Sequence, residues 1–593
     1  KTGIKIISSS AAIDPSQIPQ VRGAQLFGAH KLGASVTAQS RQEIQRVKYF
    51  RSISTWLRTR DGWEIATLVL LFGLAALICV TFQDYGMSWD EDFSRWQGRD
   101  FLAWYGSGFR NRAVMSHANA EYVYGSLFNV VSLVASDHSP FGPFETSHLL
   151  IATLGLVSVF FAYRVGKLLS GPMAGFFSAL ILTLTPTYYG HMFMNPKDVP
   201  FAVFFIVAVY YLLRAYDRLP RLELRTIVVT GLAMSLPMSV RPAGMLLLVY
   251  FVILVGFWFV AQFWKNPSRP LRATWKDIQW AGVSFLPAAA ISWVLMLAWW
   301  PYGQLRPISN PLEIFLKSTK FTEWHWTILY RGTYIQSGFL PWHYLPGSFL
   351  VTLPEFYPLA IVGGAAALIV WALRRRAAPA ADIDSRIKLA FFVFVAFFPL
   401  AAAIVMKPIM YDGTRLFLFV LPPLAVVSGV VFARLISGNL PLMLKSLLTL
   451  ILVGIAGATV VDMIRLHPYE YVFFNRSSGG LPAANGKYET EYWATSYKEG
   501  IEWVMRNYEP DAPVASVRVA NLSNPILTFY YLATEKPHQY RFLQVDARDH
   551  PNVVLSITRW NQQLSYPGRV LYVVERMGTP LLYVTEVRPV GAP

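Results

Sequence analysis

The chain has 593 residues, of which 54% are hydrophobic and only 15% are charged. Soluble domains carry about a quarter charged residues, so this composition excludes an ordinary soluble protein. The single cysteine, Cys79, excludes a disulfide framework and a cysteine-based metal site. A net charge of +17 would indicate nucleic-acid binding in a soluble protein, but in a membrane protein the location of the basic residues matters more than their sum.

The first residues form a polar segment. Residues 1 to about 45 are rich in Ser, Ala and Gln and have no sustained apolar period. We expect a cytoplasmic tail over residues 1–62, part of it disordered.

Apolar segments follow one another along residues 63–463. About 20 apolar residues span a bilayer as a helix, so the pattern predicts an α-helical polytopic membrane protein. Eleven spans are expected, the fifth of them short: 63–83, 146–168, 172–189, 199–214, 226–240, 243–263, 279–299, 348–373, 388–406, 414–434 and 443–462.

The charges between these spans predict the orientation. With the N-terminus in the cytoplasm, every connection on the inner side is basic: 46–60, 164–167, 214–225, 265–276, 374–388 and 434–445. The opposite side holds most of the acids: 84–100, Asp198, Glu313, Glu323 and Asp412. The positive-inside rule therefore predicts an odd number of spans, with the C-terminus outside.

An acidic cluster directly follows the first span, in the sequence Met87-Ser88-Trp89-Asp90-Glu91-Asp92. Charge near hydrocarbon is costly, so this cluster indicates a working site that holds a base, a metal ligand or both. A solvated helix end is the equally weighted alternative. The loop that contains it, 84–145, is long and includes amphipathic stretches at 93–101 and 122–134, which predict helices in the membrane interface.

Three further outer connections carry charged residues. Lys197 and Asp198 lie between two prolines at the second. Arg241 at the third and Arg415 at the fifth depart from the positive-inside trend. Such an arginine calls for an anionic partner, although snorkelling or pairing with a nearby acid is a serious alternative for Arg241.

The fourth outer loop, 299–346, is rich in Trp and His. These side chains suit either a groove for lipid or sugar or an interfacial belt, and the belt is favoured for most of them.

Acids and cations are thus expected together on one face of the membrane. Arginine binds phosphate through its planar fork, and a carboxylate can accept a proton from a hydroxyl. The combination suits a phosphate-bearing lipid and a reaction that needs a base. No His-rich or paired ligand spacing argues for a metal, so no cofactor is predicted with certainty and a divalent metal stays open.

The last part of the chain, 464–593, has a mixed and polar composition. A helix is predicted at 497–507 and strands at 513–519, 553–557, 570–574 and 582–587. We expect a small extracytoplasmic α/β domain that recognises the acceptor or covers the site. A structural or partner-docking module is at least as well supported.

The sequence resembles the GT-C glycosyltransferases of the family-39 type, which include the protein O-mannosyltransferases and the lipid A aminoarabinose transferase. Asp90-Glu91 matches the acidic motif after the first span, and Asp198 matches a second acid at the second outer turn. The late Arg-then-Pro pattern is matched by Tyr411-Asp412-Gly413-Thr414-Arg415 with Pro422-Pro423, and 467–475 resembles a stretch after the last span.

The resemblance covers residues 63 to about 480. It implies inverting sugar transfer from a polyprenyl-phosphate donor to a hydroxyl of a lipid, glycan or protein acceptor, at the outer face of a bacterial inner membrane. Asp90 would be the base, and Glu91 and Asp198 would orient the substrate or hold a metal. Lys197, Arg241 and Arg415 would hold the phosphate, with Tyr411 and Asp412 beside them in the substrate site.

Two other functions stay open. A transporter usually has charges or breaks in mid-span, or internal repeats, whereas here the spans are mostly free of charge. A catalytically silent accessory subunit of a membrane complex is the second alternative, against which the intact acidic motif argues only moderately.

Overall fold

The computed structural model describes residues 61–115, 121–268, 270–318, 325–373, 383–510, 516–534 and 541–587. The predicted cytoplasmic tail up to residue 60 lies outside these residues, as do Glu323 and the basic residues Arg374 to Arg376.

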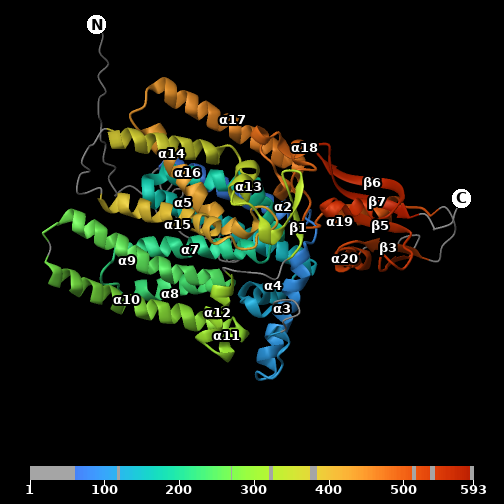
Figure 1. Cartoon of the computed structure of the whole chain (residues 1–593), viewed down its shortest axis with the longest axis horizontal. Helices are drawn as coiled ribbons and strands as arrows, with labels where there is room; N and C mark the ends of the chain where they lie inside the picture. Colours follow the sequence, from blue (N-terminus) through green and yellow to red (C-terminus); the bar gives the residue numbers. More distant parts are fainter. Residues whose placement is uncertain are drawn as a thin grey trace, which may run out of the picture. The chain divides into compact units, whose positions relative to one another are not determined.

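Long apolar helices form most of the chain and run side by side (Figure 1). They are α2 (Gly62–Thr81), α5 (Pro143–Thr183), α7 (Asp198–Tyr216), α8 (Leu224–Met238), α9 (Leu246–Lys265), α10 (Leu271–Ala298), α14 (Phe356–Leu373), α15 (Ile383–Met406), α16 (Leu421–Ser437) and α17 (Leu442–Leu466). Each of the eleven predicted apolar segments overlaps one of these helices. The prediction of an α-helical, multi-pass membrane protein is therefore confirmed.

The exact number of spans is not confirmed. Within the described residues, eight helices are long and apolar enough to cross a membrane, or nine if the pair α13 (Tyr344–Thr352) and α14, bent by 110°, forms one span. Helix α5 counts once here, although non-helical backbone at Ser170 and Gly171 divides it where two spans were predicted. Helix α8 has 15 residues and is too short to be counted.

Helices α5, α7 and α16 lie at the centre of the helical part. Nearly every side chain of α7 is buried, whereas α2 and α17 expose apolar side chains such as Phe72 and Leu442. The central helices approach closely because small residues face one another: a Cβ at Gly429 would stand 2.5 Å from the Ser178 nitrogen. This arrangement suits a bundle whose outer helices face lipid.

Short elements connect the helices at the ends where the charged motifs lie. They are α3 (Trp89–Gly106), η1 (Ala113–Met115), η2 (Glu121–Val123), α4 (Leu127–Ser136), α6 (Pro186–Met194), η3 (Pro242–Met245), α11 (Pro301–Leu305), α12 (Ser309–Ser318), η4 (Ser337–Phe339) and η6 (Arg415–Val420). Both amphipathic stretches of the first long loop are helical, in α3 and α4.

The aromatic loop after α10 contains a hairpin that the sequence analysis did not predict. Strands β1 (Thr327–Tyr330) and β2 (Thr333–Gln336) pair antiparallel, with Ile328 opposite Ile335. Arg331 and Gly332 form the turn with φ of 53° and 81°, and positive φ at both central residues is what a two-residue hairpin turn requires.

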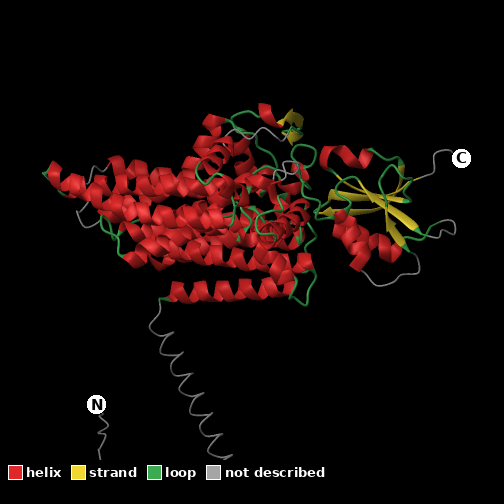
Figure 2. Ribbon diagram, turned by 90° about the horizontal axis from the view of Figure 1, so that it is seen from below, coloured by secondary structure: helices red, strands yellow, loops and turns green. Residues whose placement is uncertain are grey.

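A five-stranded sheet forms the C-terminal part of the chain (Figure 2). Its order is β4-β3-β5-β7-β6, in which β3 is parallel to β4 and β5, and β7 is antiparallel to β5 and β6. The elements are η7 (Glu470–Val472), η8 (Arg476–Ser478), α18 (Gly480–Ala484), α19 (Tyr497–Asn507), β3 (Val517–Asn521), α20 (Ile526–Thr534), β4 (Phe542–Gln544), β5 (Val553–Ile557), η9 (Arg559–Leu564), β6 (Gly568–Arg576) and β7 (Thr579–Val587).

The predicted small C-terminal α/β fold is confirmed. Helix α19 and strand β5 have the predicted bounds, and β6 and β7 extend beyond theirs. Strand β3 begins at Val517, four residues after the predicted start. Helix α20 and the three-residue strand β4 were not predicted.

The sheet region contacts the start of α3. The Tyr531 hydroxyl accepts a hydrogen bond from the Met87 backbone nitrogen at 2.7 Å, and the Tyr530 hydroxyl donates to Glu145 at 2.7 Å. Helix α20 therefore helps to fix the segment that carries the acidic motif.

Candidate active site

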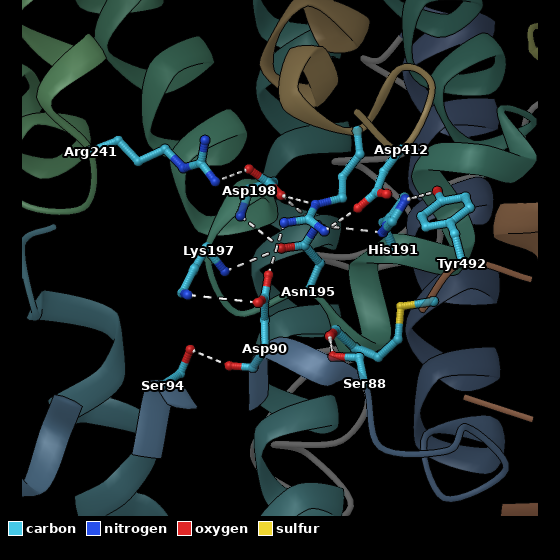
Figure 3. A network of polar contacts seen from close by, with 12 residues as sticks. Ser88, Asp90, Ser94, His191, Asn195, Lys197, Asp198, Arg241, Asp412 and Tyr492 are labelled. Carbon is cyan, nitrogen blue, oxygen red and sulfur yellow. Dashed lines mark hydrogen bonds and ion pairs between the residues drawn. The ribbon is translucent and has the colours of Figure 1, made fainter. Parts of the chain in front are cut away.

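Three carboxylates converge on the guanidinium of Arg415, at the start of η6. Its Nη2 donates to Asp90 at 2.9 Å, its Nη1 to Asp412 at 2.6 Å, and its Nε to Asp198 at 3.2 Å. Figure 3 shows the three acids, which come from three separate segments and are directed toward one another. The Trp493 ring lies 4.5 Å from it and covers it. Every nitrogen of Arg415 is thus paired with a carboxylate.

Asp90 stands in the first turn of α3. The start of this helix is anchored by Ser88, whose hydroxyl donates to the Met194 carbonyl at 2.8 Å. The Asp90 side chain is 22% exposed, whereas those of Asp198 and Asp412 are 4% and 3% exposed. Asp90 is therefore the carboxylate of this network that a bound molecule can reach most easily.

Asn195 organises the turn between α6 and α7. Its side-chain oxygen accepts hydrogen bonds from the backbone nitrogens of Lys197 and Asp198, at 3.2 and 2.8 Å. Its amide nitrogen donates to the Asp198 carboxylate at 3.0 Å. An Asn side chain that bonds backbone two and three residues ahead stabilises such a turn, and here it also fixes the first residue of α7.

Two further cations lie beside Asp90 and Asp198. The Lys197 ammonium is 3.8 Å from Asp90 and lies 3.9 Å from the Phe93 ring centre and 5.3 Å from that of Tyr124. It makes no hydrogen bond to any described residue. Arg241 pairs with Asp198 through Nη2, while its buried Nε has no hydrogen-bond partner in the described part of the chain. Both cations therefore keep donors for another anion.

The C-terminal region supplies an arginine to the same network. Arg559, at the start of η9, donates to Asp412 at 2.6 Å and to the Tyr492 carbonyl at 2.8 Å, and its Nε lies 3.3 Å from Glu489. Asp412 joins the two arginines from a backbone with φ of +55°. An unbroken series of ion pairs thus runs from Arg559 through Asp412 and Arg415 to Asp90.

Charge around Asp90 determines its protonation. Burial by itself raises the pKa of Asp90, but the positive charges of Lys197, Arg415 and Arg241 outweigh it and lower the pKa below its usual value. Burial lowers the pKa of Lys197, against which the charge of Asp90 acts. Asp90 is consequently ionised at neutral pH and available as a proton acceptor.

Glu91 has a different environment although it is adjacent to Asp90. Its carboxylate accepts a hydrogen bond from the Ser88 backbone nitrogen at 2.7 Å and lies 3.0 Å from the ring of His148, with 1% of its side chain exposed. A Glu at the third helical position that bonds back to the cap residue is a helix-start feature. The structure does not bring Glu91 to Arg415.

The predicted site residues fall into three groups. Asp90, Lys197, Asp198, Arg241, Asp412 and Arg415 are brought together. Tyr411 flanks them, with its ring 5.5 Å from the Arg415 guanidinium. Glu91 lies apart.

Asn195, Arg559 and Trp493 were missed by the sequence analysis. The only signal for Arg559 is its position directly after the fully buried strand β5, and the signal for Asn195 is the Asn-Pro pair before α7. No signal marks Trp493.

No three or more His, Cys, Asp or Glu side chains are grouped to hold a metal ion within the described residues. The acids around Arg415 have cations already beside them.

Comparisons with known proteins agree with the resemblance. Residues 144–293 match the family model of dolichyl-phosphate-mannose-protein mannosyltransferases. This segment runs from α5 into α10 and includes Lys197, Asp198 and Arg241, but neither Asp90 nor Arg415. The match confirms the predicted resemblance to glycosyltransferases of the protein-mannosyltransferase type over this part of the chain. No curated protein sequence matches the chain significantly.

Two solved structures are similar in their arrangement of elements. One is the crystal structure of ArnT from Cupriavidus metallidurans bound to undecaprenyl phosphate, with 15% sequence identity and a TM-score of 0.43. The alignment covers 87% of this chain and 97% of the ArnT chain. The oligosaccharyltransferase AglB from Archaeoglobus fulgidus, in complex with an inhibitory peptide and a dolichol-phosphate, has 12% identity, covers 77% of this chain and 62% of its own, and gives a TM-score of 0.44.

Proposed function

We propose that this membrane protein is an inverting glycosyltransferase that moves a sugar from a polyprenyl-phosphate donor to an acceptor hydroxyl. The observation that carries the proposal is the position of Asp90: an ionised carboxylate, the most exposed of the network, beside two cations that retain free donors. The family match over residues 144–293 supports the same class of reaction.

The residues suit the steps of such a transfer. The acceptor hydroxyl oxygen attacks the anomeric carbon and its proton passes to Asp90, while the bond from that carbon to the phosphate oxygen breaks. The bonding electrons leave with the polyprenyl phosphate, whose developing charge needs cations nearby. Attack opposite the leaving group inverts the anomeric configuration.

We assign the phosphate to Lys197 and Arg241, because these cations have unused donors. Arg415 contacts three carboxylates, and a phosphate at its guanidinium would have to replace one of them. Arg415 therefore holds Asp90 and Asp198 in position and limits their mutual repulsion, with Tyr411 and Asp412 beside it. Glu91 supports the start of α3. No step is assigned to a metal.

The location is part of the proposal. We propose that Asp90, Asp198, Arg241 and Arg415 face the extracytoplasmic side of a bacterial inner membrane; the basic connections at the opposite ends of the helices support this orientation. The acceptor is a hydroxyl of a lipid, glycan or protein.

The test measures free polyprenyl phosphate released by the full chain in lipid nanodiscs. A panel of polyprenyl-phospho-sugars is offered with a membrane extract as the source of acceptor. Wild-type protein should release the product only with the extract. Asp90→Asn should reduce the rate by about 100-fold or more, the usual contribution of a general base.

Asp92→Asn is the matched control, because Asp92 is two residues away on the same helix and bonds only Trp96 among the described residues, at 3.2 Å. Its rate should stay within about twofold of wild type. Equal release by the Asp90 and Asp92 variants contradicts the role of Asp90. If no donor gives release, the proposed transferase activity is contradicted, and the transporter or accessory-subunit function is favoured.

A further inference from the structure

A polar cavity lies where three segments distant in sequence meet: the β1–β2 hairpin, residues 485–490 and η9. We call it the hairpin cavity. Its walls include Tyr334, Thr490, Arg559, Asn561, Gln563 and Tyr583, and it encloses about 590 Å³ of space between atoms, part of it open to solvent. Sites for small ligands are concave and present a few polar groups that fix the ligand, and this cavity has both features.

The lining is polar but carries no unbalanced charge. Among its described residues, Glu489 and Arg559 are the charged ones, and they lie 3.3 Å apart. Arg559 is also bound to Asp412. Because its cation is already satisfied, the cavity does not suit a phosphate. Its amides and hydroxyls do not suit a hydrocarbon chain. A neutral ligand with many hydroxyls matches both conditions.

Several polar groups of the cavity lack a protein partner. The buried Oε1 of Gln563 and Oε2 of Glu489 have no hydrogen-bond partner in the described part of the chain, and the Glu489 side chain is only 6% exposed. The Asn561 side chain bonds no described residue. A buried polar group without a partner is costly, so hydroxyls of a ligand that bond to Gln563 and Glu489 would lower the free energy, while the exposed Asn561 offers its amide at the edge of the cavity.

The η9 turn is fixed in an uncommon shape that presents these side chains. Trp560 and Asn561 have φ of 54° and 56°. Trp560 donates to the Thr327 carbonyl at 2.9 Å and stacks on Trp326 with ring centres 5.0 Å apart. The hairpin and the turn therefore form a stiff wall with the amides of η9 at its edge.

A second cavity connects this wall with the Arg415 network. It encloses about 480 Å³, shares Leu329, Tyr488 and Glu489 with the hairpin cavity, and reaches Asp412 and Thr414, next to Arg415. A molecule bound at η9 therefore lies beside a second hollow that borders the candidate active site.

From these observations we infer that the hairpin cavity is a carbohydrate subsite, which binds one or two neutral sugar rings through Asn561, Gln563 and Glu489. The inference rests on the proposed function for its role in transfer, because the sugar could be that of the donor or part of a glycan acceptor. The binding itself does not require transfer.

The experiment titrates the full chain in nanodiscs with methyl glycosides and di- and trisaccharides, and measures dissociation constants by ligand-observed NMR. The variants are Asn561→Gly, which removes the amide and suits the positive φ, and Gln563→Leu, which keeps the volume. Gln562→Ala is the control, because its neighbouring side chain does not line the cavity. At least one saccharide should bind to wild-type protein and to the control, and at least tenfold more weakly to each of the other two variants.

Addition of the polyprenyl-phospho-sugar panel then distinguishes the two sources. Displacement of the saccharide by one donor assigns the cavity to the donor sugar, and simultaneous binding assigns it to an acceptor glycan. The inference is overturned if no saccharide binds, or if the Asn561 and Gln563 variants bind as well as the control. Donor turnover by the same samples tests the proposed function separately, so failure of one leaves the other measurable.

Discussion

Two acids of the protein have opposite pKa shifts: Asp90, at the helical end of the ion-pair series, and Glu491, in the C-terminal part of the chain. At the helical end, burial raises the pKa of Asp90, but the three cations around this side chain lower it further than burial raises it. At the C-terminal end, Glu491 is almost wholly buried and accepts hydrogen bonds from Ser496, at 3.1 and 3.3 Å. Burial raises the pKa of Glu491 to about 7.

Glu489 has an intermediate position. It shares Arg559 with Asp412, and burial raises its pKa to about 7, against which the charge of Arg559 acts. The comparison teaches that burial and neighbouring charge together decide which acids of this protein are ionised, since one arginine beside Glu489 does not offset its burial.

Arg415 lies in the middle of the ion-pair series, and its removal should have the largest effect on stability. Arg415→Ala leaves three acids without their shared cation, and such a loss in a buried pair costs about 3–5 kcal/mol. We expect little folded protein and a strongly lowered melting temperature, measured by fluorescence-detected size exclusion after heating. Arg434→Ala, near the C-terminal end of α16, removes an exposed arginine that bonds the Ser170 hydroxyl and should lower the melting temperature far less. Equal stability of the two variants would contradict the central role of Arg415.

Glu491→Gln tests the C-terminal end. The pKa of Glu491 is raised on folding, so its contribution is most favourable below about pH 4.5 and is lost as the pH rises to about 7. The loss amounts to about 3 kcal/mol. The variant should therefore melt at a higher temperature than wild type at pH 8 and at a similar one at pH 4.5. Glu502→Gln serves as control, since Glu502 pairs with Arg506 on the surface. If the variant is no more stable than wild type at pH 8, ionisation of Glu491 does not destabilise the folded protein.

The link between the two ends is tested by Arg559→Met. Because Arg559 holds Asp412, which holds Arg415, we expect kcat for donor turnover to fall about 10-fold to 100-fold, with a smaller change in KM for the donor. A double variant with Asp412→Asn should lose little more than the single variants, because both remove the same link. Arg569→Met, which affects an exposed pair with Glu586, is the control. Additive losses would mean that Arg559 acts elsewhere.

Lys197→Met tests the helical end of the ion-pair series. It should have the smallest effect on stability of the four single variants. The charge of Lys197 lowers the pKa of Asp90, so its removal should raise that pKa. In plots of kcat/KM against pH, the acidic limb should move to higher pH, by on the order of one unit. Lys498→Met removes a cation that bonds the Gln83 carbonyl and is not among the cations that lower the pKa of Asp90, so it should leave the limb in place. If the acidic limb does not move, or moves to lower pH, it does not report the protonation of Asp90.

The sequence by itself determined the class of the protein and the candidate residues. Runs of about 20 apolar residues must form helices in lipid, because their backbone groups have no other partners there. Helical periodicity predicted α19, and a short apolar run between turn residues predicted β5, both with their observed bounds. The charged residues at the ends of the spans stood out because charge is costly at such positions.

Only the tertiary structure decided which of these residues act together. Asp90 and Glu91 are adjacent in sequence, but successive helix positions point about 100° apart, so one meets Arg415 and the other meets His148. Arg559 and Asp412 are separated by 147 positions along the chain, and no local pattern encodes their contact. The pKa of Asp90 likewise depends on cations brought near by folding, and that of Glu491 on its burial, neither of which a linear sequence specifies.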